Sequence, residues 1–509
     1  MSLLFKNTNE NTKKISEDTF KDLSLEELMN TICMGDTEKD RMKDIFINIP
    51  TDIETIKYRQ EILKDFMTKR ELREGVSDAL VKMKILAESD RGGSMFGEMK
   101  SGIWQMIRFL VDLELYTDIV SQLDSIFSQN VPESEGLKEV ASHIHSMAME
   151  CEASDLKEDI RKAREQMEST KSLTLGINLT PDLTAEEVFV MNFYPHRLKP
   201  STDRIGEFVR TVKQIKAHEP PDHMMLDLTR EVEKHFGAMA KKIRASLIKY
   251  TSLDGKYLYD LKDEFLFYIR VSNFGEELKE NGNVICFPNL SACNYIKMNN
   301  VYNIRLALFK EPNIVKNDFS FDENGRIYIL TGPNRGGKTV LTQGVGLALY
   351  MAALGIFVTA DSYDGFCIER ILTHFPADEE KTVSYGRLGE EAVRVRSFIK
   401  DLDSKTIILL NETYSTTCAS DGLYLAKDLV RIMKERGALS IYNTHIHELG
   451  LAEDELNTFD GASKVVSIIM EILNNENTFR VLRSKPDVSS YAKNIAQKYG
   501  VTYEQMKEI

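Results

Sequence analysis

The sequence predicts an α/β domain with a largely parallel sheet in its C-terminal part, preceded by a mainly α-helical region. Up to about residue 300, apolar residues recur at helical spacing, and the whole chain holds only 12 prolines and 28 glycines in 509 residues. After residues 281–289, short apolar runs alternate with helical patterns, as in strand–helix–strand units. A glycine-rich segment joins one of these runs to a helix.

The helical region contains two clear amphipathic patterns. One runs over 156–167, and a longer one of about six turns runs over 228–247. Residues that break helices gather at 178–181, 195–200 and 218–221. We expect these three segments to separate long antiparallel helices.

The C-terminal part contains four apolar runs that read as buried strands, at 326–330, 355–359, 406–410 and 439–442. The patterns at 340–353 and 422–434 predict helices between them. The segment Val340–Ala360 carries no charge and is long enough to span a bilayer. Because it contains glycines and polar residues, we predict a buried helix running into a buried strand.

The bulk composition limits the functional class. A chain of 509 residues is long enough for about two to four domains. The net charge of −14 excludes a protein that coats nucleic acid with its whole surface, so any such contact must be local. The N-terminus has no apolar signal segment and the six cysteines are scattered, which predicts a cytoplasmic protein.

A phosphate-binding loop follows the run that ends at Leu330. Its sequence fits the pattern G-x-x-x-x-G-K-[ST] and opens the helix predicted from residue 340. In such a loop, backbone N–H groups surround the phosphates, the lysine reaches the β- and γ-phosphates, and the following hydroxyl meets Mg²⁺. The predicted ATP-binding residues are Gly332, Pro333, Asn334, Arg335, Gly336, Gly337, Lys338 and Thr339.

A second element of the phosphate site follows the run at 406–410, where Asn411 and Glu412 end a predicted central strand. P-loop ATPases usually carry Asp at the first position, where it holds the Mg²⁺ shell. A charge pair about 4 Å apart is worth roughly 4 kcal/mol at an effective dielectric of about 20, so the neutral Asn411 should hold Mg²⁺ less firmly. Glu412 remains available as a general base.

His445 follows the strand predicted at 439–442. A histidine at such a strand end can donate a hydrogen bond to the γ-phosphate. We therefore predict ATP and Mg²⁺ as ligands, Glu412 and His445 as catalytic residues, and Thr339 and Asn411 at the metal.

These motifs, in this order, resemble the ATPase of the MutS family of DNA mismatch-repair proteins. Residues 331–337 (TGPNRGG) resemble the TGPNMGG loop of that family, and 351–360 resemble MAQIGSFVPA. Residues 411–422 are similar to DE…GTST…DG, and 444–449 (THIHEL) are similar to THYHEL. The resemblance covers roughly residues 310–509 and implies an ABC-type P-loop NTPase domain.

A weaker resemblance covers the N-terminal region. Residues 50–60 resemble the start of the MutS core domain, and 263–289 resemble the return from the lever helices. The resemblance implies a core (1–100), lever- or clamp-like helices (101–260), a return segment (261–309), the ATPase (310–475) and a helical C-terminal segment (476–509). We expect a shortened MutS-like chain without the N-terminal mismatch-recognition domain, so direct mismatch recognition is doubtful.

The resemblance also implies a homodimer in which each subunit closes the nucleotide site of the other, and in which ATP gates a helical clamp. Ser384 stands where the family has its trans-acting serine. The most basic helical segment could meet DNA phosphates without reading sequence, or could be an ordinary solvated face. Its residues are Lys241, Lys242, Arg244 and Lys249.

Two functions stay open at this point. The first is a DNA-binding ATPase in DNA repair or recombination, which the resemblance implies. The alternative is a nucleotide-gated scaffold that hydrolyses ATP slowly and binds a protein or ribosomal partner, which Asn411 and the acidic charge favour. Neither function requires a membrane.

Overall fold

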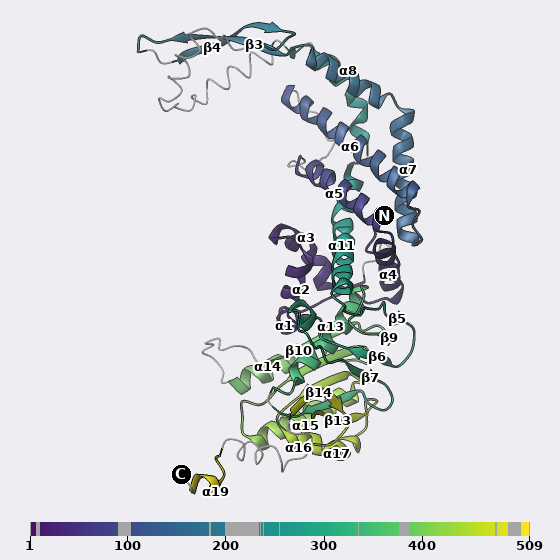
Figure 1. Ribbon diagram of the computed structural model, residues 1–509, viewed down its shortest axis with the longest axis vertical. Coiled ribbons are helices and arrows are strands. Elements are labelled where there is room, and N and C mark those ends of the chain that lie inside the picture. The colour runs from purple at the N-terminus through teal and green to yellow at the C-terminus, as the bar shows by residue number, and fades with distance from the viewer. Residues whose placement is uncertain are drawn as a thin grey trace. The chain divides into compact units, whose positions relative to one another are not determined.

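The computed structural model describes residues 2–6, 11–89, 103–182, 185–198, 234, 236–237, 239–253, 255–333, 335–375, 387–473, 476–486 and 500–507 (Figure 1). It divides into two compact units. Unit 1 comprises Met1–Arg70, Pro132–Leu137 and Leu266–Ile509, and unit 2 comprises Glu71–Val131 and Lys138–Phe265.

A six-stranded sheet forms the centre of unit 1. The first five strands of its order β10-β11-β12-β8-β13-β14 are parallel to their neighbours, and β14 is antiparallel to β13. The predicted strands at 326–330, 406–410 and 439–442 are confirmed. The strands are β8 (Ile327–Thr331), β10 (Arg370–His374), β11 (Thr406–Asn411), β12 (Leu439–Asn443), β13 (Val465–Leu473) and β14 (Glu476–Leu482).

Helices cover both faces of this sheet, as the two-residue side-chain period of buried strands requires. Ile408 and Leu410 of β11 point into a core with α14 (Arg387–Ile399) and α15 (Ala419–Glu435). Leu409, between them, lies against Gly346 of α13 on the other face. Two short helices, α16 (His447–Leu451) and α17 (Glu453–Asn457), cover the same face as α14 and α15.

Helix α13 (Lys338–Leu354) is buried along nearly its whole length. Its glycines allow close packing, since a Cβ on Gly344 would lie 3.0 Å from the backbone N of Asn303. Among the described residues, no helix combines the length and apolar character needed to cross a membrane.

The prediction of a strand at 355–359 is wrong. After Gly355, which ends α13 with a φ of 86°, only Val358 forms a β-bridge, with Cys286. The run is apolar because it is buried beneath α11 (Gly255–Glu280), where Phe357 packs against Phe274. The next strand, β9 (Ser362–Gly365), belongs to a separate sheet of order β5-β9-β6-β7. Its other members are β5 (Asn289–Leu290), β6 (Ile296–Val301) and β7 (Asn317–Phe321).

The N-terminal segment belongs to the same unit as the large sheet. It is mainly helical, and a short antiparallel pair is formed by β1 (Thr12–Lys14) and β2 (Asn48–Pro50). Helix α1 packs against β10, and α4 packs against α13. The helices are α1 (Glu17–Asp22), α2 (Leu25–Ile32), α3 (Asp36–Ile47), α4 (Ile53–Thr68) and, later in the chain, α12 (Ile304–Leu308).

Unit 2 contains long helices and one β-hairpin, which Figure 1 shows as the paired β3 (Ser172–Leu179) and β4 (Ala185–Tyr194). The pattern over 156–167 is confirmed by α8. Residues 239–247 are helical and bury Ile243 and Leu247, whereas most of the start of the 228–247 pattern lies outside the described residues. The other elements are α5 (Arg70–Ser89), α6 (Ile103–Gln129), α7 (Glu135–Ala153), α8 (Leu156–Glu168) and a 3₁₀ turn at Ile248–Ser252.

The hairpin corrects the expectation that 178–181 and 195–200 separate helices. Residues 178–181 lie at the end of β3 and the start of the hairpin turn, and Pro195 directly follows β4. Residues 476–482, which we placed in a helical segment, form β14, and helix α19 (Tyr503–Lys507) follows later. Segment 218–221 lies outside the described residues.

Candidate nucleotide site

The carboxyl ends of β8, β11 and β12 meet at one edge of the large sheet because these strands are parallel neighbours. β8 leads through Gly332 and Gly337, which have φ angles of 142° and 90°, into α13. A Cβ on Gly332 would lie 3.2 Å from the backbone N of Met470, so a side chain would be both crowded and strained there. Asn334 lies outside the described residues.

Lys338 begins α13 and is 6% exposed. Its Nζ donates to the carbonyl oxygens of Gly332 at 3.0 Å and Pro333 at 3.1 Å. Burial lowers the pKa of Lys338, and the Glu412 carboxylate acts in the opposite direction. Since an ammonium group has three N–H donors, this arrangement leaves one for an anion.

Thr339, Asn411 and Asn443 form a polar cluster beside Lys338. Thr339 Oγ1 donates to Asn411 Oδ1 at 3.3 Å, and Asn443 Nδ2 donates to the same Asn411 oxygen and, at 3.4 Å, to Thr339 Oγ1. Asn443 Oδ1 is buried without a hydrogen-bond partner in the part of the chain that the structure describes. Oxygen ligands of this kind fit Mg²⁺, which binds carboxylate, amide and phosphate oxygens, but these three carry no charge.

Glu412 and His445 lie beside the same edge of the sheet. His445 Nε2 donates to Glu412 Oε1 at 2.7 Å, and the two side chains are 37% and 33% exposed. The backbone N of Glu412 also donates to the carbonyl oxygen of Asn443 at 2.8 Å. A carboxylate oriented by a histidine and open to solvent has the geometry of a general base for a bound water.

A cavity of about 430 Å³ opens beside the phosphate loop, and Lys338, Thr339 and Glu412 line it. The rest of its wall comes from residues 301–317 and from Phe479 of β14, which supply apolar and amide side chains and the carboxylate of Glu311. Phe479 lies beside the phosphate loop, since a Cβ on Gly337 would be 3.0 Å from its ring. The wall residues outside the phosphate loop include Val301, Tyr302, Asn303, Leu306, Asn313, Val315, Asn317 and Phe479.

Asn443 and this wall were missed in the sequence analysis. Asn443 ends β12 two residues before His445, so its position at a strand end was a usable signal. Phe479 had no comparable signal, because its place in the cavity depends on the pairing of β14 with β13.

The remaining predicted residues are Ser384 and the four basic residues. Ser384 is outside the described residues. The basic residues belong to unit 2, where Lys241 and Lys242 are exposed and Arg244 is half-buried. Lys249 forms an ion pair with Asp159 at 2.9 Å, so its charge is already partly compensated.

Comparison with known proteins adds two family matches. A model described as MutS domain V matches residues 328–508, and one described as the MutS2 N-terminal domain matches 51–281.

Individual relatives align over smaller shares of their own length. The Endonuclease MutS2 of Caldicellulosiruptor saccharolyticus is 30% identical over 165 residues, which are 32% of this chain and 21% of that protein. The DNA mismatch repair protein MutS of Fusobacterium nucleatum is 24% identical over 466 residues, which are 87% of this chain and 48% of that protein. This chain thus spans less than half the length of these relatives. The two family matches, in this order along one sequence, show that the chain belongs to the MutS family.

Proposed function

We propose that this protein binds ATP and hydrolyses it in an ABC-type site on unit 1. The observation that carries the proposal is one cavity lined by both the phosphate loop and Glu412, with His445 2.7 Å from that carboxylate. Loop amides at the N-terminus of α13 would hold the phosphates, since the helix dipole favours negative charge there. The third N–H of Lys338 would meet a phosphate oxygen.

The wall of the cavity supports a nucleoside as the rest of the ligand. Val301, Leu306, Val315 and Phe479 offer apolar surface for a base, while Asn303 and Asn313 offer amide groups. Small-molecule sites commonly combine apolar walls with a few polar groups that orient the ligand.

For hydrolysis, Glu412 would accept a proton from the attacking water, and His445 would hold Glu412 and donate toward the γ-phosphate. Thr339 and Asn411 would hold Mg²⁺, which in such sites neutralises charge on the phosphates. Because neither ligand is anionic, we expect weak metal retention and slow turnover.

DNA is the proposed second ligand, and exposed basic side chains of unit 2, such as Lys241 and Lys242, would bind it. The protein would act as a homodimer in DNA repair or recombination. The relatives, which are named as an endonuclease and a mismatch-repair protein, support this proposal. ATP would gate the helical unit, with Ser384 of one subunit reaching the nucleotide of the other. A slow nucleotide-gated scaffold is the second candidate, favoured by Asn411 and by the net charge of −14.

Two measurements test these proposals. Isothermal titration of ATP into the magnesium-supplied protein should give saturable heat, and Lys338→Ala should weaken the binding about 10- to 100-fold. The absence of heat with the native chain would remove the ATPase proposal. Fluorescence anisotropy with duplex, single-stranded and junction DNA at two salt concentrations tests the second ligand. Lack of binding to all three at low salt would leave the scaffold as the better reading.

A further inference from the structure

The loop that follows β11 has a backbone conformation that its residues rarely adopt. Glu412 and Tyr414 both lie in the left-handed region, with φ angles of 54° and 64°. Residues with a Cβ persist in this region only where surrounding contacts hold them. The direction of the Glu412 carboxylate therefore depends on the groups that hold residues 412–414.

Besides the bond from Glu412 N to the carbonyl oxygen of Asn443, three hydrogen bonds from other elements hold this loop. Tyr442 Oη donates to the carbonyl oxygen of Thr413 at 2.8 Å, and Tyr414 N donates to Glu391 Oε2 at 2.8 Å. His374 Nδ1 lies 2.9 Å from Thr413 Oγ1. Thr413 and Tyr442 are fully buried and His374 is 4% exposed, so solvent does not compete for the two bonds at Thr413, whereas Glu391 is half-buried.

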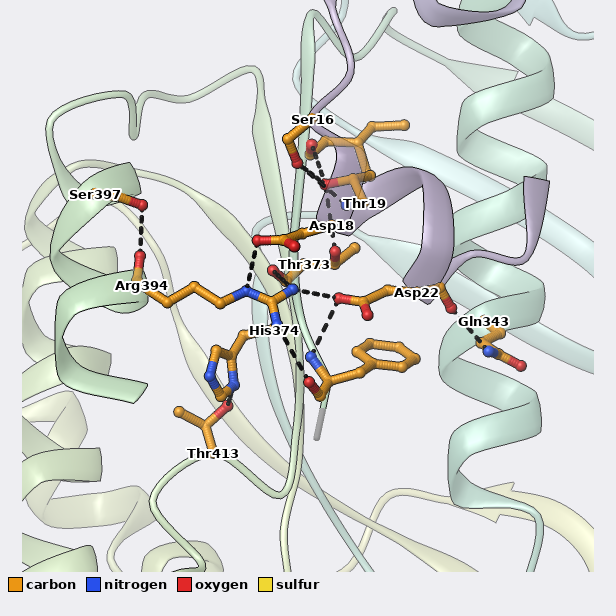
Figure 2. A network of polar contacts seen from close by, with 12 residues as sticks. Ser16, Asp18, Thr19, Asp22, Gln343, Thr373, His374, Arg394, Ser397 and Thr413 are labelled. Carbon is orange, nitrogen blue, oxygen red and sulfur yellow. Dashed lines mark hydrogen bonds and ion pairs between the residues drawn. The ribbon is translucent and has the colours of Figure 1, made fainter. Parts of the chain in front are cut away.

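Arg394 connects the two elements that carry His374 and Glu391. His374 ends β10, and Glu391 lies on α14 three residues before Arg394. Figure 2 shows the guanidinium between α14 and β10, where it donates to the carbonyl oxygens on both sides of His374. The distances are 3.2 Å to Thr373 and 3.3 Å to Phe375.

Two carboxylates of α1 orient this guanidinium (Figure 2): Asp18 Oδ2 lies 3.1 Å from Arg394 Nε and is more exposed, and Asp22 is the more buried of the two. Asp22 Oδ2 accepts from Arg394 Nη2 at 2.7 Å and from the backbone N of Phe375 at 3.2 Å, and the Asp22 side chain is only 12% exposed. The carbonyl oxygen of Asp22 accepts from Gln343 Nε2 of α13 at 2.9 Å. One residue of α1 therefore contacts both the helix that follows the phosphate loop and the strand end that holds the Glu412 loop (Figure 2).

We propose that Asp22 and Arg394 are positioning residues for Glu412, which they hold in place through His374 and Glu391. The N-terminal helix α1 is then part of the hydrolytic apparatus, although it contributes no group to the cavity. This inference rests on the proposed ATPase activity and adds to it two residues that lie outside every nucleotide motif of the sequence.

The test compares kcat with ATP affinity in Asp22→Asn, Arg394→Gln and Arg394→Lys. A displaced Glu412 should lower kcat on the order of tenfold to a hundredfold, since small misplacements of reacting groups are costly. The dissociation constant of ATP should stay within about threefold, because the contacts to the phosphates are unchanged. Arg394→Lys should not rescue turnover, since an ammonium group cannot reproduce the planar fork that reaches four acceptors.

The matched control is Glu38→Gln, which breaks another largely buried carboxylate–guanidinium pair, that of Glu38 with Arg270 at 2.8 Å, whose residues do not line the cavity. It should lower thermal stability while leaving kcat unchanged. In a Glu412→Gln background, Asp22→Asn should cause no further loss of turnover, because the group that it positions is already removed.

If Asp22→Asn and Arg394→Gln have the same kcat as the Glu38→Gln control and the native protein, the positioning role is wrong and the ATPase proposal remains intact. If the native protein binds ATP but does not hydrolyse it, both the hydrolysis proposal and the positioning role are wrong. If Asp22→Asn does not fold, Thr413→Val replaces it, since this variant removes only the hydroxyl that meets His374. Normal kcat in a folded Thr413→Val would likewise contradict the inference.

Discussion

Units 1 and 2 place their charged side chains in different environments. In unit 1, Asp22 and Arg394 are 372 residues apart in the sequence, largely buried, and bonded to the backbone around His374. In unit 2, Arg161 pairs with Glu158 and Glu165 of its own helix, and these three side chains are 44–61% exposed. Buried pairs fix geometry, whereas exposed pairs on one helix contribute little to stability. The Asp22–Arg394 pair can therefore hold a neighbouring group in place, whereas the pairs of Arg161 leave a solvated surface.

The largest effect should come from Lys338→Ala, which tests whether chemistry is confined to unit 1. Removing the ammonium group should lower turnover on the order of 10³-fold and ATP affinity about 10- to 100-fold. Turnover assays and titration calorimetry measure the two quantities. Lys427→Ala, which breaks an exposed pair with Glu455 on the same unit, is the control and should change neither.

Glu412→Gln should separate binding from hydrolysis. Loss of the general base should reduce turnover on the order of 10²-fold or more, while ATP still binds within a few-fold of the native affinity. Filter binding followed by chromatography of the bound nucleotide would show intact ATP. Rapid conversion to ADP in this variant would assign the base to another residue.

The free energy of unfolding should depend on His374 in acid. Burial, with a further contribution from Arg394, lowers the pKa of His374 from 6.5 to about 4. Between these values the unfolded chain binds a proton that the folded chain does not, so stability falls as pH drops from 6.5 to 4 and levels off below. The loss attributable to this group is on the order of 3 kcal/mol. Urea unfolding across this range should show a correspondingly weaker pH dependence in His374→Gln.

Asn411→Asp tests whether the neutral side chain of Asn411 limits Mg²⁺ binding in the nucleotide site of unit 1. A carboxylate beside Thr339 should tighten Mg²⁺ retention and raise turnover by about tenfold, less than the unscreened Coulomb energy, because Asn443 and solvent compensate in part. Titration of Mg²⁺ at fixed ATP gives the half-saturating concentration. Identical curves for the two proteins would mean that Asn411 does not limit the metal.

The smallest effect should come from unit 2. Lys241→Gln together with Lys242→Gln should weaken DNA binding a few-fold at low salt and reduce the salt slope by about two, as expected for lost phosphate contacts. Lys249→Gln should matter less because Asp159 already pairs with that lysine. If the double variant changes ATP turnover in the absence of DNA, these lysines of unit 2 affect hydrolysis as well as DNA binding.

Local patterns made much of unit 1 predictable. The strands at 406–411 and 439–443 are apolar runs ended by polar residues, and parallel pairing brings their ends together with the phosphate loop. The run at 355–359 was misleading because burial by α11 and pairing in a sheet demand the same apolar residues. The β3–β4 hairpin had a signal, the alternation of Leu173, Leu175 and Ile177, but nearby Asn and Pro residues are equally typical of breaks between helices.

In the candidate site, too, only residues within local sequence motifs could be predicted. Lys338, Glu412 and His445 could be proposed from their motifs, and the structure places Glu412 beside both His445 and the cavity that Lys338 lines. Asp22 and Arg394 could not, because 372 residues separate them in the sequence. Phe479 could not either, because its place depends on the β13–β14 pairing and on a contact with Asn317, which lies 162 residues earlier. No local spacing encodes such pairings.

The burial of α13 has a consequence for measurements of local opening. Leu347–Ala352 are covered on every side, so their amide hydrogens can exchange with deuterium only when the surrounding unit opens as a whole. Mass spectrometry of that peptide therefore gives the opening free energy of unit 1. Against this internal reference, protection that ATP adds at residues 412–414 can be read as local ordering of one loop.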